Sequence, residues 1–295
     1  MKKIVLTGGS GFIGSNLVPY LAKQGYELHL LQRNSTATPL PDGVYSHIIP
    51  KESSAFTSLL KQIAPDGIIH LATCFLASHK TEQIPDMISA NVTLGCLLLQ
   101  AVSELPLTWF LNIGTFWQHI NASSYHPVNL YAATKQAFEV IARYYYQEFP
   151  INFLTLCLND TYGPGDKRRK IFNLWKELLT SDTSLDMTEG EQIMDILYIT
   201  DCIAAIGQCI TLLEQDKIRQ WNGKIVYASS SHKQSLRETA QIFERVSGRK
   251  LRINWGKKQY RPNEIMKPAC FGIPVPKWKS KISLEEGIRK FLENE

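Results

Sequence analysis

The chain has 295 residues, 44% of them hydrophobic and 20% charged, the composition of a globular protein with one large or two modest domains. Its net charge of +5 suits an anionic ligand, and without a nucleic-acid motif it predicts no nucleic-acid partner. The N-terminus does not resemble a signal peptide, and no apolar stretch approaches the roughly 18 residues of a membrane span. We therefore expect no membrane partner and a cytoplasmic location.

The six cysteines form no C-x-x-C pair, which predicts reduced thiols and no metal site.

Apolar strand patterns alternate with helical patterns from residue 1 to about residue 160. Strands are predicted at 1–7, 26–34, 66–73, 107–115 and 151–159, and helices at 12–25, 54–63, 85–105 and 129–149. Residues 36–50 contain three prolines and are predicted as a loop. Alternation of this kind predicts an α/β fold, a Rossmann-type doubly wound parallel sheet with helices on both faces.

The alternation weakens after about residue 165, which predicts a second domain. We expect a dinucleotide-binding Rossmann domain at 1–162, to which a late strand returns from the C-terminal half. Residues 163–295 are expected to form mainly a smaller, mixed α/β domain that binds the substrate. The stretch rich in Pro and Lys near the end is predicted to be irregular before a last short helix.

A glycine-rich segment, TGGSGFIG at 7–14, directly follows the first strand and opens the first helix. Small residues let backbone N–H groups approach a pyrophosphate, and the helix N-terminus supplies partial positive charge. This context favours dinucleotide binding over a plain glycine-rich turn. The predicted contacts here are Thr7, Gly8, Gly11, Phe12, Ile13 and Gly14.

The end of the second strand carries Gln32 and Arg33, where an NAD site often has a carboxylate. A carboxylate would repel a 2′-phosphate, whereas an arginine can bind one through charged hydrogen bonds. The pair therefore predicts NADPH as the cofactor. NAD stays the alternative, with Arg33 solvated and Gln32 on a ribose.

Three pieces then stand in order: TGGSGFIG, NIGT at the end of a strand, and Y-x-x-x-K at Tyr131 and Lys135. With IIHLAT, NVTLG, TYGPGD and DILYITD, they resemble the extended short-chain dehydrogenase/reductase family of nucleotide-sugar epimerases, dehydratases and ketoreductases. The match covers nearly the whole chain. The segment GTFWQHINASSYHPVNLYAATKQAFE is most similar to reductases of the CDP-abequose or CDP-paratose synthase type.

The resemblance implies a catalytic set of Thr115, Tyr131 and Lys135. Tyr131 would exchange a proton with the sugar oxygen, and Lys135 would lower the pKa of Tyr131 and hold the nicotinamide ribose. Thr115 would bind the carbonyl oxygen. Further cofactor contacts are expected from Leu71 and Ala72. Substrate contacts are expected from Thr73, Phe116, Trp117, Asn159, Asp160 and Arg168.

Dehydratases of this family carry an Asp-Glu pair directly after the catalytic Thr, where this chain has Phe116 and Trp117. Neither aromatic residue can exchange the required protons, which argues against a dehydratase. Cys157 stands where the family often has Arg, so that substrate contact is in doubt.

The leading hypothesis is an NADPH-dependent reduction of the 4-keto group of a nucleotide-linked deoxyhexulose. The alternatives are an NAD-dependent nucleotide-sugar 4-epimerase and a non-catalytic nucleotide-binding regulator. By analogy with the family we expect a homodimer that pairs the helices at about 87–104 and 129–148.

Overall fold

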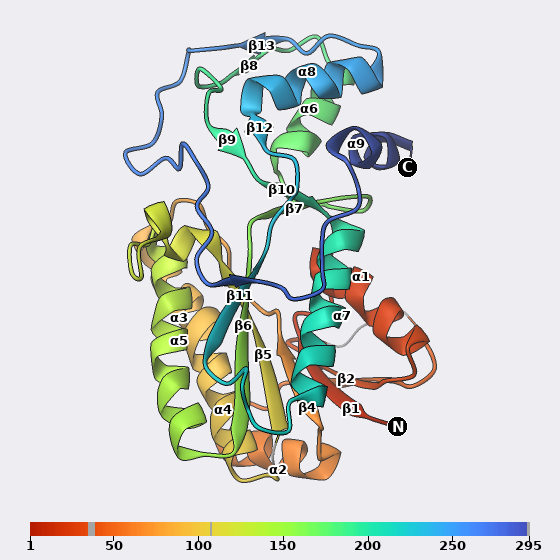
Figure 1. Ribbon diagram of the computed structural model, residues 1–295, viewed down its shortest axis with the longest axis vertical. Helices are drawn as coiled ribbons and strands as arrows, with labels where there is room; N and C mark the ends of the chain where they lie inside the picture. The colour runs from red at the N-terminus through yellow and green to blue at the C-terminus, as the bar shows by residue number, and fades with distance from the viewer. Residues whose placement is uncertain (35–38, 107, 294–295) are drawn as a thin grey trace.

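The described residues form one large parallel sheet of eight strands with helices on both faces (Figure 1). The computed structural model describes residues 1–34, 39–106 and 108–293. The strands are β1 (Lys3–Thr7), β2 (Glu27–Gln32), β3 (Val44–Ile48), β4 (Gly67–His70), β5 (Thr108–Thr115), β6 (Ile151–Leu158), β11 (Lys224–Ala228) and β14 (Ile273–Pro274). Their order in the sheet is β3-β2-β1-β4-β5-β6-β11-β14. The chain thus winds outward from β1 in one direction and then from β4 in the other, which confirms the predicted Rossmann-type fold.

Two hydrophobic clusters hold the helices against the two faces of the sheet. Val5 lies in one cluster and its neighbours Ile4 and Leu6 in the other, because successive residues of a strand point to opposite faces. Helices α1 (Phe12–Lys23) and α7 (Ile199–Gln215) cover the face of Ile4 and Leu6. The opposite face is covered by α2 (Ser53–Ile63), α4 (Leu94–Ser103) and α5 (Leu130–Glu148).

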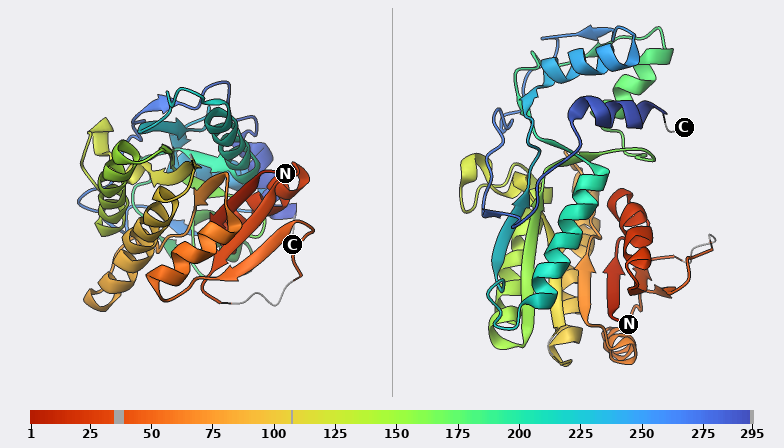
Figure 2. Two further views of the ribbon diagram at one scale, coloured as in Figure 1. Left: turned by 90° about the horizontal axis from the view of Figure 1, so that it is seen from below. Right: turned by 45° about the vertical axis from the view of Figure 1, so that its right-hand side comes forward.

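A smaller group of elements lies beyond the carboxyl ends of the main strands (Figure 2). Its helices are α6 (Ile171–Thr180), α8 (Leu236–Ser247) and α9 (Leu284–Glu293). Its strands form the pairs β7 (Asp160–Tyr162) with β10 (Ile196–Tyr198), β9 (Ile193–Met194) with β12 (Gln234–Ser235), and β8 (Leu185–Asp186) with β13 (Ile253–Asn254). Since α7, β11 and β14 return to the main sheet, the second half of the chain contributes to both groups. The predicted domain boundary at residue 162 stays a prediction.

The predicted helix at 85–105 is part of a longer helical stretch from Thr81 to Ser103. It comprises η1 (Thr81–Gln83), α3 (Ile84–Ile88), the π-helical segment η2 (Ser89–Thr93) and α4. By length and composition this stretch could cross a membrane, so the expectation that no stretch approaches that length was wrong. Core helices of soluble proteins meet the same criterion, and α4 packs against α2 and α5.

Two edge strands were missed by the sequence patterns. Within the predicted loop at 36–50, residues 36–38 lie outside the described residues, and β3 pairs with β2 along its whole length. The predicted irregular tail contributes β14, which pairs with β11. Of β3 only Val44 is buried, and both residues of β14 are exposed. Edge strands held mainly by backbone hydrogen bonds leave no apolar run for a pattern to detect.

The contact between α4 and α5 depends on the missing side chain of Gly95. A Cβ at this position would overlap the ring of Phe138, which is completely buried. We expect Gly95→Ala to destabilise the protein by about 1–3 kcal/mol, even though alanine favours helix. The measurement is urea unfolding. The loss should shrink in a Phe138→Leu background, where the ring no longer occupies the space. A Gly95→Ala protein as stable as the parent would contradict this packing.

Candidate active site

The carboxyl ends of the central strands bring the predicted site residues to one edge of the sheet. Thr7 pairs in register with Leu31 of β2 and His70 of β4, and Thr115 pairs with Leu158 of β6. The residues that follow these strands therefore face one crevice, where parallel α/β sheets bind their ligands.

The glycine-rich loop packs tightly against the residues after β4. Gly8 has φ +75°, and a Cβ there would lie 2.6 Å from the backbone nitrogen of Ala72. A Cβ on Gly14 would collide with the carbonyl oxygen of Gly8. Thr7 fixes this arrangement, because its Oγ1 accepts a hydrogen bond from the Ala72 N–H at 3.2 Å and contacts His70 Nδ1 at 2.8 Å. The predicted cofactor residues Leu71 and Ala72 thus lie against the loop.

The first turn of α1 offers its N–H groups beside this loop. Gly11 is the N-cap, and no side chain caps the helix. Phe12 opens the helix with its ring under the Arg168 guanidinium, and Ile13 packs against the core. The glycines leave a space next to the loop that side chains would otherwise fill. The N–H groups of the first turn of α1 have no side-chain cap, so together they fit the pyrophosphate of a dinucleotide.

Gln32 and Arg33 lie where the second strand ends. Gln32 is the last residue of β2 and is partly buried, and its carbonyl accepts a hydrogen bond from Ile49 N at 2.9 Å. Arg33 is exposed. Its position fits a contact with the ribose end of a bound dinucleotide, while the preference for NADPH stays a prediction.

Tyr131, Lys135 and Thr115 come from two neighbouring elements. Tyr131 and Lys135 lie one turn apart near the start of α5, which Asn129 caps by accepting a hydrogen bond from Ala132 N at 3.0 Å. Thr115 ends β5, and its Oγ1 accepts a hydrogen bond from Trp117 N at 3.3 Å. The short helix η3 (Phe116–Gln118) follows Thr115 and contacts α5. The three predicted catalytic residues therefore lie on adjoining elements.

Burial determines the protonation states of Tyr131 and Lys135. It raises the pKa of Tyr131 to about 12 and outweighs the opposing effects of the Thr73 hydrogen bond and the Arg168 charge. The expectation that the pKa of Tyr131 would be lowered was wrong for the protein alone. Burial lowers the pKa of Lys135 to about 8, against the opposing charge of Glu139. At neutral pH the phenol is protonated, and Lys135 is mostly an ammonium.

A buried asparagine that the sequence analysis did not single out positions Thr73. Asn91 lies in the π-helical segment η2, a distortion found mostly at functional sites. Its Oδ1 accepts from Thr73 Oγ1 at 2.9 Å, and its Nδ2 donates to Thr134 Oγ1 at 2.9 Å. Thr73 in turn opposes the rise in the pKa of Tyr131. Asn91 opens the NVTLG segment, so the resemblance to the family pointed to this stretch, but no role was predicted for the asparagine.

A cavity that is open to solvent lies next to the segment that follows Thr115. Four predicted substrate residues line it, namely Phe116, Trp117, Asn159 and Asp160. The ring of Phe75 contacts both Trp117, which lines the cavity, and Tyr131, at 5.6 Å and 4.9 Å between ring centroids. Sequence reasoning missed further polar lining residues: His119, Gln192, Asp195 and Glu264.

Asp195 holds part of the cavity wall in place. Its carboxylate accepts hydrogen bonds from Ser229 Oγ at 2.6 Å and Ser230 N at 2.8 Å, and it pairs with Lys233 at 3.2 Å. The carboxylate thereby connects the chain between β9 and β10 to the segment that follows β11. Asp195 appeared in the sequence only as part of DILYITD, because the groups that it binds lie more than 30 residues away.

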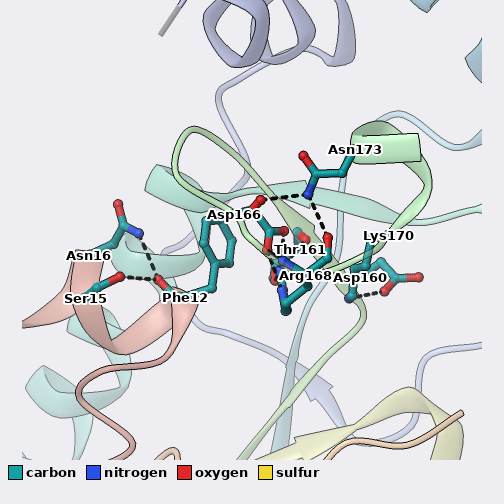
Figure 3. A network of polar contacts seen from close by, with 9 residues as sticks. All are labelled: Phe12, Ser15, Asn16, Asp160, Thr161, Asp166, Arg168, Lys170 and Asn173. Carbon is teal, nitrogen blue, oxygen red and sulfur yellow. Dashed lines mark hydrogen bonds and ion pairs between the residues drawn. The ribbon is translucent and has the colours of Figure 1, made fainter. Parts of the chain in front are cut away.

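Arg168 makes its contacts within the chain (Figure 3). Its Nε and Nη2 donate to the two carboxylate oxygens of Asp166, each at 2.7 Å, and Nη2 also donates to the Thr161 carbonyl at 2.9 Å. The guanidinium lies 4.5 Å from the centre of the Phe12 ring. Arg168 thus joins the glycine-rich loop to the segment after β7, and it does not line the cavity. Its predicted contact with the substrate stays a prediction.

The family model of the NAD dependent epimerase/dehydratase family matches residues 4–222. Two curated relatives are CDP-abequose synthases. The protein from Yersinia pseudotuberculosis is 27% identical over 90% of this chain and 91% of its own length. The protein from Salmonella muenchen is 25% identical over 99% of this chain and 97% of its own length.

Solved structures show the same fold. The UDP-glucuronic acid 4-epimerase from Bacillus cereus, in complex with UDP-glucuronic acid and NAD, has a TM-score of 0.83 at 21% identity and covers 99% of this chain and 98% of its own. The UDP-glucose 4-epimerase from Thermotoga maritima, with UDP-glucose, has a TM-score of 0.82 at 17% identity, with 99% and 97% covered. The family match spans more than half of the sequence, so the chain belongs to the NAD dependent epimerase/dehydratase family.

Proposed function

We propose that this protein reduces the 4-keto group of a nucleotide-linked deoxyhexulose with NADPH, in the manner of a CDP-abequose or CDP-paratose synthase. The observation that carries the proposal is a protonated Tyr131 one helical turn from the buried Lys135, on a helix that adjoins the segment after Thr115, where Phe116 and Trp117 line a cavity. The two CDP-abequose synthase relatives support the sugar class.

The chemistry follows from the protonation states. A bound nicotinamide would supply the hydride for the carbonyl carbon. Tyr131, whose pKa is raised to about 12, holds the proton that the developing alkoxide takes up. Thr115 donates a hydrogen bond to the same oxygen, and the Lys135 charge stabilises the phenolate that remains. A protonated tyrosine suits reduction, whereas oxidation of an alcohol needs the phenolate first.

The residues after Thr115 favour reduction over elimination of water. Phe116 is buried and packs toward Tyr227, at 6.1 Å between ring centroids, and Trp117 lies near Phe75. Both line the cavity, and neither can exchange a proton with the sugar. Their apolar surfaces suit a deoxygenated sugar face.

The same proposal includes a homodimer. The outer face of α5 exposes Val140, Ile141 and Tyr144, and Ile88 is exposed on α3. Apolar side chains of this size on neighbouring helices suit a helical interface between two copies. The cytoplasmic location remains an expectation from the sequence.

An NAD-dependent 4-epimerase is the second candidate. The similarity to solved 4-epimerases in complex with NAD favours it, and it would use the same three catalytic residues. Purified protein would then carry tightly held cofactor and need no added reductant. A non-catalytic regulator would have no need of the buried Tyr131 and Lys135.

Tyr131→Phe removes the proton that the proposal assigns to the alkoxide. We expect kcat to fall by about 10²–10⁴-fold, the usual contribution of a general acid, while cofactor affinity changes little. The assay follows NADPH absorbance with a CDP-linked 4-keto-3,6-dideoxyhexose. Tyr45→Phe, at an exposed position of β3, is the matched control outside the proposed site and interface and should keep full activity. Full turnover by Tyr131→Phe would contradict the scheme.

Arg33→Ala tests the cofactor preference. We expect calorimetric titration of the cofactor-stripped protein to show much tighter binding of NADPH than of NADH. Arg33→Ala should weaken NADPH binding by about 1.5–3 kcal/mol, the contribution of a charged hydrogen bond, and leave NADH unchanged. Arg143→Ala, exposed on α5, serves as the control for loss of a positive charge. Equal or tighter binding of NADH by the parent protein would favour the epimerase.

A further inference from the structure

A carboxyl group that the proposed reaction does not use lies one turn beyond Lys135 on α5. Glu139 and Lys135 are four residues apart and share a helix face. Lys135 is only 3% exposed, and an ammonium so poorly hydrated needs a nearby negative charge. In the described part of the chain, Glu139 is the carboxylate whose charge raises the pKa of Lys135.

Side chains from two strands and the loop after Thr115 hold Glu139 in place. Its Oε1 accepts hydrogen bonds from Gln118 Nε2 at 3.1 Å and from Asn112 Nδ2 at 3.5 Å. Thr155 of β6 accepts a hydrogen bond from Asn112 Nδ2 at 3.2 Å and so helps to orient that amide. Both Gln118 and Asn112 are completely buried, so these contacts are shielded from water.

Gln118 connects Glu139 to the catalytic threonine. While its Nε2 donates to Glu139, its Oε1 accepts a hydrogen bond from the backbone N–H of Thr115 at 2.8 Å. Because the Gln118 amide donates to the carboxylate of Glu139, its NH2 group is fixed on that side, and its oxygen must point toward the Thr115 N–H. The position of Thr115 therefore depends on the same carboxyl group that lies one helical turn from Lys135.

We propose that Glu139 is a positioning residue of the active site, which keeps Lys135 as an ammonium and, through Gln118, fixes the backbone at Thr115. The proposal rests on the proposed function for the roles of Lys135 and Thr115. As Tyr131 gives up its proton, the Lys135 charge must be present to stabilise the phenolate, and Glu139 keeps it present.

The charged and titratable groups around Glu139 and Lys135 determine how a change at Glu139 shifts the pKa of Lys135. Burial raises the pKa of Glu139 to about 7, and the Lys135 charge opposes the shift. Lys135 also interacts with Cys157 of β6, whose pKa is well above its usual value, and with His70 of β4. The charge of Glu139 also raises the pKa of Tyr146, which lies two turns further along α5. Loss of the Glu139 charge removes a factor that raises the pKa of Lys135, so the lysine would lose its proton at lower pH.

The test is Glu139→Gln, with the pKa of Lys135 read from the pH dependence of its side-chain NMR signal in lysine-labelled protein. We expect a downward shift on the order of one pH unit. The alkaline limb of the kcat profile should move in the same direction. Glu148→Gln makes the same change at an exposed position of α5 and should shift neither. Glu139→Asp keeps the charge and should restore most of the pKa.

Gln118→Leu separates the two parts of the proposal. It breaks the connection to Thr115 but leaves the Glu139 charge, so kcat should fall about tenfold, the value of one hydrogen bond to a charged group, without a shift of the alkaline limb. Gln118→Leu also tests the proposal if the Glu139→Gln protein does not fold. An unchanged Lys135 pKa in folded Glu139→Gln would overturn the proposal, as would an unchanged kcat in Gln118→Leu. The NMR readout needs no sugar, so a shifted Lys135 in a protein without reductase activity would reject the proposed function alone.

Discussion

The burial of the Lys135 ammonium is the constraint on which the rest of the site depends. A charge that is only 3% exposed loses most of its hydration, and burial lowers its pKa to about 8. The fold tolerates it because α5 brings Glu139 within one turn, and Asn112 of β5 and Gln118 of η3 hold that carboxylate by hydrogen bonds. Burial also raises the pKa of Tyr131, which keeps its phenol protonated. The proposed proton donor and the cation thus lie one helical turn apart near the start of α5.

The register of the parallel strands brings the predicted cofactor-binding residues to the edge of the sheet where Thr115 lies. Thr7, His70 and Ala72 tie β1 to the loop after β4, and Gly8 can make that approach only without a Cβ. The contact of Arg168 with Phe12 continues this connection toward the smaller group of elements (Figure 3). The glycine-rich segment is therefore held by Ala72 at its start and by Arg168 at Phe12, where α1 begins.

Most of the main sheet could be predicted from the sequence, because buried parallel strands such as β1 and β6 are continuous apolar runs bounded by turn residues. The edge strands β3 and β14 could not, since backbone pairing holds them and their side chains are largely exposed. The grouping of Thr115, Tyr131 and Lys135 followed from motif order and the resemblance. Asn91, Asp195 and Glu139 lie in quoted segments, but no role was predicted for them because their hydrogen bonds join residues distant in the chain. The direction of the Tyr131 pKa shift was wrong, because the extent of burial is a property of the folded protein.

The most direct test of the central claim is the fate of the transferred hydrogen. The protein would be supplied with NADPH deuterated at C4 of the nicotinamide and with a CDP-linked 4-keto-3,6-dideoxyhexose, and the sugar product analysed by mass spectrometry and NMR. The account predicts one deuterium at C4 of the sugar for each NADPH oxidised. Conversion of an intact nucleotide sugar into its 4-epimer, with no deuterium incorporated and no NADPH consumed, would contradict it.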